Sequence, residues 1–307
     1  MGFSLVVVLV SCYRLYHKKS KNFSFAVISD VQYSDKPCKQ VLGMERRYSE
    51  ALVKLYQVIR WVGEQRSLTC LVHLGDLIDG NETEQQTMKE YSQVCAAFSE
   101  SKVPVFHVVG NHCLDVSRDT LKELFPSTGC FYYRWEPNDE WCFLFLDCLE
   151  ISCKSALNEQ HQQQVQHYLS TQQPRATRWN GALSSTQLDW LEHELQHCRQ
   201  KVIVFGHIPL YQEASDAAHL VWNAEQVLDI LHRYRVVAYF AGHYHRGGYA
   251  VDAHGLHHIT FPAICDAPAD QNAWAKIRCE SNRIIVQGYG TVPSRTWTLS
   301  LCKTRHK

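Results

Sequence analysis

The chain has 307 residues, of which 45% are hydrophobic and 20% charged, and 31 basic residues balance 31 acidic ones. This composition is typical of a globular protein, and the zero net charge excludes a global basic field that would recruit nucleic acid or a membrane. Thirteen cysteines without a Cys-x-x-Cys pair fit neither a zinc knuckle nor a compact disulfide framework. We therefore expect a monomeric, cytoplasmic protein that binds no nucleic acid.

Residues 1–22 form an extension that we expect to lie outside the catalytic domain. An apolar run from Phe3 to Cys12 precedes a basic stretch that ends at Lys21. About ten apolar residues are too few to span a bilayer, and a signal peptide carries its positive charge before the apolar run, not after it. Two readings stay open, a plain extension and a segment for membrane association or secretory entry. Membrane contact is expected only through residues 1–21.

The first half of the chain alternates predicted strands with predicted helices. Apolar runs predict strands at 23–29, 71–74 and 103–109. Apolar residues at helical spacing predict one helix from Tyr48 to Val62, ending near Gly63, and a second helix around the stripe from Met88 to Phe98. Successive strand–helix units favour a parallel sheet in an α/β fold, with ligands at the carboxyl ends of its strands.

The second half continues without a Pro/Gly/Ser-rich linker, so residues 23–301 are expected to form one domain. Ser184 with Gln187 matches a capping box that opens a helix. The polar stretch 159–173 is expected to be a surface insertion. Strands are expected at 142–146, 202–205, 236–240, 256–264, 273–279 and 283–287.

Five short polar motifs each follow an apolar strand. They are Ser29-Asp30-Val31-Gln32, Gly75-Asp76, Gly110-Asn111-His112, Gly206-His207 and Gly242-His243-Tyr244-His245. The glycine before each of Asp76, Asn111, His207 and His243 is expected to let the backbone turn sharply off its strand and aim the next side chain at a shared point. The order and context of the motifs predict one site.

This set of side chains suits a pair of divalent metal ions. Two carboxylates, two amide oxygens and three imidazoles are enough ligands for two ions that share Asp76. The predicted ligands are Asp30, Gln32, Asp76, Asn111, His207, His243 and His245. Oxygen and imidazole donors without thiolate favour Mn²⁺ or Fe²⁺ over zinc. Two such ions leave a local positive charge of about +2, which attracts phosphate, and a metal-bridging hydroxide would attack phosphorus.

His112 follows a predicted ligand directly and is the candidate catalytic residue. It is expected to point at the substrate, where it stabilises the phosphoryl oxygens or protonates the leaving group. The alternative is that His112 only orients Asp76 or Asn111.

Arg46 and Arg47 are expected to open the first long helix, where they either contact a substrate phosphate or, as we favour, lie on a solvated face. Five other histidines are read as structural, two in strands and the rest near a turn: His73, His107, His254, His257 and His258.

The order of the motifs resembles the calcineurin-like metallophosphoesterase superfamily, in which histidine usually stands where this chain has Gln32. With that departure and the segments 45–48, 75–80, 179–184 and 242–249, residues 23–295 are similar to the manganese-dependent ADP-ribose/CDP-alcohol diphosphatase family. Relative to similar sequences, Arg246 replaces an acidic residue and Tyr244 lies between two ligands, so both are candidates to alter substrate preference.

The resemblance implies a four-layer αββα sandwich and a dimetal Mn²⁺ centre. It implies hydrolysis of the pyrophosphate bond of ADP-ribose and of CDP-alcohols such as CDP-choline and CDP-glycerol, giving a nucleoside monophosphate and a phosphorylated alcohol or sugar. By position, one metal would take Asp30, Gln32, Asp76 and His245. The other would take Asp76, Asn111, His207 and His243.

Three rival functions use the same motifs. A protein serine/threonine phosphatase would carry Asp-Arg-Gly, whereas Asp79 is followed directly by Gly80. A cyclic-nucleotide phosphoesterase would share the metal site, and the choice among ADP-ribose, CDP-alcohols and cyclic nucleotides depends on loops that the motifs do not specify. A non-catalytic metal-bound scaffold is disfavoured because all seven ligand positions and His112 are present.

Overall fold

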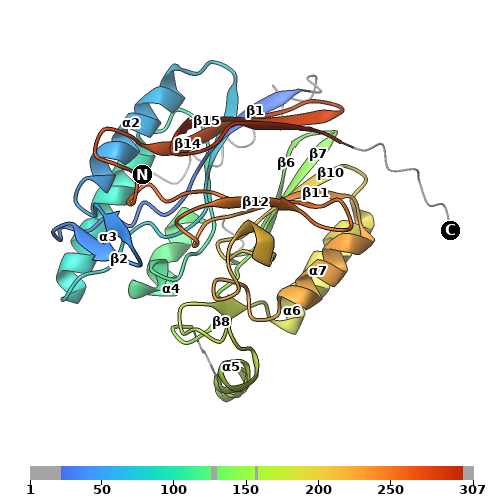
Figure 1. Ribbon diagram of the computed structural model, residues 1–307, viewed down its shortest axis with the longest axis horizontal. Coiled ribbons are helices and arrows are strands. Elements are labelled where there is room, and N and C mark those ends of the chain that lie inside the picture. Colours follow the sequence, from blue (N-terminus) through green and yellow to red (C-terminus); the bar gives the residue numbers. More distant parts are fainter. Residues whose placement is uncertain (1–21, 126–129, 156–157, 300–307) are drawn as a thin grey trace.

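The computed structural model describes residues 22–125, 130–155 and 158–299, and the predicted extension at 1–22 lies outside them except for Asn22. Two six-stranded sheets pack face to face with helices on their outer sides (Figure 1). This is the expected four-layer αββα arrangement of an α/β protein. None of the helices in these described ranges is long and apolar enough to cross a membrane.

The first sheet has the order β16-β15-β14-β1-β4-β5. Its strands β1, β4 and β5 run parallel, as the repeated strand–helix units predict, whereas β14 joins β1 antiparallel. The sheet is therefore mixed. The strands are β1 (Phe23–Ile28), β4 (Leu68–His73), β5 (Val105–His107), β14 (Ala273–Cys279), β15 (Arg283–Gly290) and β16 (Arg295–Thr298).

The second sheet has the order β12-β13-β11-β10-β7-β6, with β7, β10, β11 and β13 parallel. Edge strands β6 and β12 and the edge strand β16 of the first sheet were not predicted, because short, partly polar edge strands give a weak apolar signal. The strands are β6 (Tyr133–Asn138), β7 (Trp141–Phe145), β10 (Lys201–Phe205), β11 (Val236–Ala241), β12 (Gly248–Val251) and β13 (His257–Thr260).

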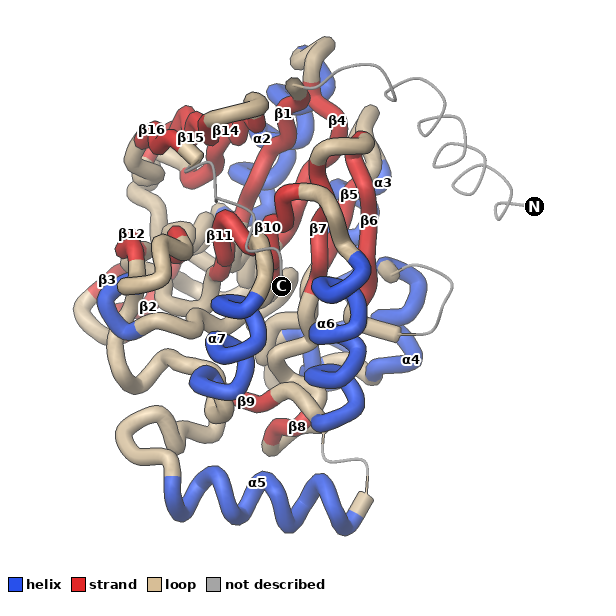
Figure 2. Tube along the Cα trace, turned by 90° about the vertical axis from the view of Figure 1, so that its right-hand side faces the viewer, coloured by secondary structure: helices blue, strands red, loops and turns tan. Residues whose placement is uncertain are grey.

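Helices α2 (Ala51–Glu64) and α3 (Glu84–Ser99) cover the first sheet, and α6 (Ser185–His197) and α7 (Ala224–Arg233) cover the second (Figures 1 and 2). The short helix α4 (Arg118–Leu121) follows β5. Helix α5 (Glu159–Thr171) stands away from both sheets at one end of the molecule (Figure 2). Two small sheets pair β2 (Lys39–Val41) with β3 (Met44–Arg46), and β8 (Ile151–Ser152) with β9 (Gly181–Ala182).

The structure corrects two details of the helices and gives the conformation of a third segment. Tyr48 precedes α2, whose buried stripe instead runs through Ala51, Leu55 and Val62. Ser184 caps α6 by accepting from the Gln187 backbone N–H, but the Gln187 side chain does not return to Ser184; its Oε1 accepts from Asp147 N at 2.9 Å. The polar insertion at 159–173 is a surface helix, with Asn158 as its N-cap.

The two sheets meet over an aromatic core. Phe25 on β1 packs against Phe143 on β7, with ring centroids 4.9 Å apart, and Phe143 packs against Phe205 on β10 at 4.8 Å. All three side chains are fully buried. Because β1 and β10 also carry polar motifs at their carboxyl ends, the core holds the two halves of the site at a constant separation.

Replacing Phe25 by alanine should lower the free energy of unfolding by about 3–5 kcal/mol, since it removes a fully buried ring and leaves a cavity between the sheets. Urea denaturation followed by circular dichroism measures the change. Val53→Ala on the exposed face of α2 is the control and should shift stability by less than about 0.5 kcal/mol. A loss below about 1 kcal/mol for Phe25→Ala would contradict the role given to this core.

Candidate metal centre

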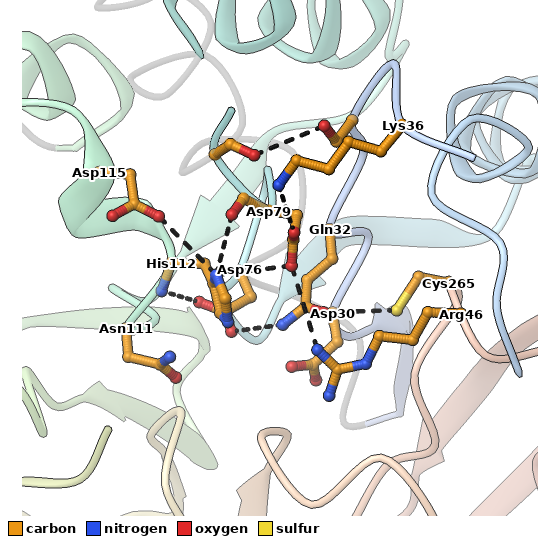
Figure 3. A network of polar contacts seen from close by, with 12 residues as sticks. Asp30, Gln32, Lys36, Arg46, Asp76, Asp79, Asn111, His112, Asp115 and Cys265 are labelled. Atoms are coloured by element: carbon orange, nitrogen blue, oxygen red, sulfur yellow. Dashed lines mark hydrogen bonds and ion pairs between the residues drawn. The ribbon is translucent and has the colours of Figure 1, made fainter. Parts of the chain in front are cut away.

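The structure brings the seven predicted ligands together from both sheets. Asp30 and Gln32 follow β1, Asp76 follows β4 and Asn111 follows β5, whereas the three histidines follow β10 and β11. All seven side chains are buried. Figure 3 shows Asp30, Gln32, Asp76 and Asn111 directed at one region, with His112 beside them.

The backbone at this region is strained. Asp30, Gln32, Asp76 and His243 have φ angles of 50°, 40°, 57° and 66°, in the left-handed region that residues with a side chain rarely adopt. Each such residue costs about 1–3 kcal/mol and persists only where its surroundings enforce it. Here the backbone N–H of Asp30 donates to Gly75 O at 3.1 Å, and the backbone N–H of Gln32 donates to Asp76 O at 2.9 Å.

The glycines of the motifs act mainly by permitting close approach. Among the four that precede predicted ligands, only Gly75 has a positive φ, 97°. A Cβ at Gly110 would lie 2.1 Å from Asp76 Oδ1, and one at Gly242 would lie 1.9 Å from Ser29 Oγ. Among these four glycines the left-handed conformation therefore occurs only at Gly75, and at Asp76 and His243 the predicted ligand itself is left-handed.

Each of the three predicted histidine ligands is held by one ring nitrogen. His207 Nδ1 lies 2.7 Å from Leu74 O, which can only accept, so Nδ1 carries the proton. His245 Nδ1 donates to Asp266 Oδ2 at 2.9 Å. The other nitrogens point inward, with His207 Nε2 3.3 Å from Asp76 Oδ2 and His245 Nε2 3.4 Å from Asp30 Oδ1.

Asn180 holds the third histidine. Its Nδ2 donates to Arg175 O at 3.0 Å and to Ala218 O at 2.7 Å, which fixes the orientation of the amide. Asn180 Oδ1 therefore accepts from His243 Nε2 at 2.9 Å, and His243 Nδ1 keeps its lone pair. The sequence analysis gave no role to Asn180 or Asp266. Asn180 stands in the quoted segment 179–184, whereas no local pattern marks Asp266.

The donor set fits a bound cation. Asp30 Oδ1 is buried and has no hydrogen-bond partner among the described residues. Ligand atoms of Asp76, His207 and His243 all lie within 4.8 Å of one another. Buried carboxylate oxygens that lack donors are costly unless a cation compensates them. The chemistry of this cluster is therefore that of a hard or borderline divalent metal site.

Asp76 and His207 shift each other's pKa in this cluster. Burial alone lowers the pKa of His207, but the Asp76 carboxylate outweighs it and raises this pKa to about 9. Burial alone raises the pKa of Asp76, but His207 and His112 hold that pKa well below its usual range. Burial and the neighbouring His207 charge lower the pKa of His243 well below its usual range. A cation at His207 Nε2 must displace a proton.

Gln32 lies at the cluster with its amide nitrogen toward the Asp76 carboxylate. Its Nε2 donates to Asp76 Oδ2 at 2.9 Å, and Cys265 Sγ donates to its Oε1 at 3.6 Å (Figure 3). Only the oxygen can bind a metal. A half-turn of the amide would exchange the two atoms and present Oε1 to a cation beside Asp76.

His112 touches the cluster through its backbone and its ring. Its N–H donates to Asp76 Oδ1 at 2.7 Å, so the residue does orient this carboxylate. Its Nδ1 lies 3.1 Å from Asp79 O and 3.8 Å from Asp115 Oδ2, and its side chain is partly exposed. Burial lowers the pKa of His112, but the Asp76 charge outweighs burial and raises this pKa above its usual value. The partly exposed ring is therefore a potential proton donor.

Arg46 and Arg47 do not open the first helix, because α2 begins at Ala51. Arg46 ends β3 and lies near the cluster, with Nε 3.6 Å from Asp266 Oδ1 and Nη1 4.0 Å from Asp79 Oδ1 (Figure 3). Arg47 instead pairs with Glu45 and Glu50. Only Arg46 is therefore placed to reach a ligand of the cluster.

The remaining histidines lie in contacts typical of structural residues. His73 and His107 form a buried pair with their Nδ1 atoms 3.2 Å apart, and burial lowers the pKa of His107 to about 3. His258 and His232 both contact Asp252 Oδ2. His257 and His258 belong to β13, so four of the five histidines are in strands and not two as expected.

Comparison with known proteins agrees with this geometry. The model of the calcineurin-like phosphoesterase family matches residues 23–247. A manganese-dependent ADP-ribose/CDP-alcohol diphosphatase from Bos taurus is 30% identical, over 89% of this chain and 93% of the relative. One of the same description from Arabidopsis thaliana is 30% identical, over 87% of this chain and 94% of the relative.

A solved structure agrees as well. A dimetal phosphatase from Danio rerio superimposes with a TM-score of 0.84 and 28% identity, covering 91% of this chain and 99% of that one. The match of the family model over most of the chain and the near-complete coverage of both relatives lead to one assignment. The chain belongs to the calcineurin-like phosphoesterase family, within its group of manganese-dependent ADP-ribose/CDP-alcohol diphosphatases.

Proposed function

We propose that this protein is a manganese-dependent diphosphatase that cleaves the pyrophosphate bond of ADP-ribose and CDP-alcohols. The observation that carries the proposal is the buried cluster around Asp76, in which two carboxylates and three oriented imidazoles converge. The names of the relatives supply the substrate class. A nucleoside monophosphate and a phosphorylated alcohol or sugar would be the products.

In the proposed centre two ions would share Asp76. Asp30, Gln32 and His245 would complete one set of ligands, and Asn111, His207 and His243 would complete the other. When bound, the two cations supply Lewis-acid polarisation of the phosphoryl oxygens and acidify the attacking water. The chain's own part is to hold the imidazoles in one tautomer and to exclude bulk water from the carboxylates, both of which raise cation affinity.

His112 acts in this proposal as the general acid. Its ring lies at the partly exposed side of the cluster, and the Asp79 and Asp115 oxygens near Nδ1 favour a protonated ring. Water oxygen forms a bond to one phosphorus, the bridging P–O bond breaks, and the bridging oxygen leaves with the electron pair. The proton from His112 then neutralises charge on that oxygen.

Aromatic side chains next to the cluster favour a nucleotide over a phosphopeptide. The His219 ring lies 5.3 Å from the His243 ring and 5.2 Å from the Tyr244 ring, and Trp179 lies 6.1 Å from His219. Trp179 is 45% exposed although it is a large apolar side chain. Exposed aromatic faces beside a phosphate site are suited to stacking with a base.

Three further properties remain part of the proposal. Residues 23–301 would form one catalytic domain, which the continuous apolar core shared by both sheets supports. The described cysteines are all free thiols, in keeping with a reducing, cytoplasmic location. A monomer is expected, and light scattering of the purified protein measures its mass.

The proposed function is tested by assaying the purified protein with ADP-ribose, CDP-choline, a cyclic nucleotide and a phosphopeptide, each with Mn²⁺, Mg²⁺ or a chelator. Cleavage of ADP-ribose or CDP-choline with Mn²⁺, and none with the chelator, is the expected result. Turnover of only the phosphopeptide or the cyclic nucleotide would replace this function with a rival. No turnover of any substrate would favour the non-catalytic scaffold.

Asp76→Ala should lower kcat for ADP-ribose by at least about 10³-fold, because the variant lacks the carboxylate proposed to be shared by both ions. Steady-state rates at saturating Mn²⁺ measure the effect, and thermal melting checks that the variant is folded. Asp139→Ala, in the exposed turn between β6 and β7, is the matched control and should keep full activity. A folded Asp76→Ala variant with substantial turnover would rule out the shared role.

Asp266→Ala should weaken Mn²⁺ binding about 10-fold to 100-fold, because His245 loses the acceptor that orients its ring. Calorimetric titration of the metal-free protein measures the affinity. Asp266→Asn keeps an acceptor oxygen without the charge and should lose less affinity than Asp266→Ala. Equal losses in the two variants would assign the effect to charge and contradict the orienting role.

A further inference from the structure

Lys154 is a cationic side chain at the rim of the metal cluster that neither the motifs nor the proposed mechanism uses. It lies just after β8, in the segment that leads from the second sheet to α5. Its Nζ donates to the Asn111 carbonyl oxygen at 3.3 Å and pairs with Asp115. Lys154 therefore stands on the side of the cluster that carries Asn111 and His112.

The ammonium group of Lys154 has a donor to spare. It carries three N–H groups, of which Asn111 O and Asp115 Oδ1 engage two. Its side chain is 41% exposed, so the remaining N–H is accessible to a ligand from solvent. The carboxylate of Asp115 also lies 3.8 Å from His112 Nδ1, so one acidic side chain lies next to both the lysine and the histidine.

Arg46, another cation near the cluster, is more fully compensated than Lys154. Arg46 lies between Asp266 and Asp79, and its side chain is 15% exposed against 41% for Lys154. Burial between two carboxylates reduces the attraction of Arg46 for an incoming anion. Of these two cations, Lys154 is the one with free donor capacity and access to solvent, and it lies beside the proposed general acid.

We propose that Lys154 binds the departing phosphate of a diphosphate substrate, so that this side chain selects for a phosphorylated leaving group. The inference rests on the proposed function. When the bridging P–O bond breaks, the electron pair moves to the leaving phosphate and His112 supplies the proton. The Lys154 ammonium pairs with the non-bridging oxygens of that phosphate, where negative charge increases. A phosphodiester whose leaving group lacks a phosphate gains nothing from Lys154.

Two substrates separate this role from a general one. ADP-ribose has a phosphorylated leaving group, whereas bis(p-nitrophenyl) phosphate has none. Lys154→Met should lower kcat/KM for ADP-ribose about 10-fold to 100-fold, as expected for loss of a charge-assisted hydrogen bond, and should change kcat/KM for the diester less than about 3-fold. Lys154→Arg should restore most of the ADP-ribose activity. Lys122→Met, which removes an exposed lysine paired with Asp119, should leave both activities unchanged.

The Mn²⁺ concentration for half-maximal activity is the second readout, because Lys154 also touches the carbonyl of a proposed ligand residue. It should be the same in the wild type and in Lys154→Met. Equal losses on both substrates, or a raised Mn²⁺ requirement, would mean that Lys154 acts through Asn111 and would overturn the proposal. Unchanged ADP-ribose kinetics in Lys154→Met would overturn it as well while leaving the diphosphatase function intact. A wild-type protein that hydrolyses only the diester would overturn both.

Discussion

The Asp76 carboxylate is the point on which the two halves of the molecule converge. Gln32 and His112, from loops of the first sheet, donate to its two oxygens, and His207 approaches it from the second sheet at 3.3 Å. Its backbone stands at a φ of 57°, and the absence of a side chain at Gly110 makes room for Oδ1. A shift between the sheets would separate these partners, so the site depends on the stiffness of the aromatic core beneath it.

The backbone strain at the site and the fixed orientation of its imidazoles both follow from the meeting of side chains from the two sheets. Four left-handed residues turn side chains away from the paths their strands would otherwise take, at a cost of about 1–3 kcal/mol each. Backbone hydrogen bonds between the β1 and β4 loops hold the turns, and Leu74 O, Asn180 and Asp266 hold the imidazoles. These contacts all come from the chain itself and limit the freedom of the side chains, which reduces the entropy lost on binding.

The fold and the convergence of the seven candidate ligands were predictable because each motif follows an apolar strand, and parallel strands end at one edge. Asp266, Asn180 and Lys154 were not predictable in these roles, because their contacts join residues 21 to 63 positions apart in the chain. The glycines and Gln32 were only partly understood for a related reason. The residue type glycine permits either a left-handed turn or a close contact, and the atoms that face it decide which of the two it serves. In the same way, the groups around Gln32 decide which atom of its side-chain amide points inward.

The charge distribution explains how a chain with no net charge can serve an anionic substrate. The carboxylates of Asp30, Asp76 and Asp266 are buried and attract cations, whereas the side chains of Lys154 and His112 are partly exposed beside them. Salt screens the partly exposed groups, so they act on an anion only at short range, whereas the buried carboxylates are screened less. Selectivity for an anionic substrate depends on where its charges meet positive side chains. Lys154 and His112 both stand on the Asn111 side of the cluster, which is where the proposal places the leaving phosphate.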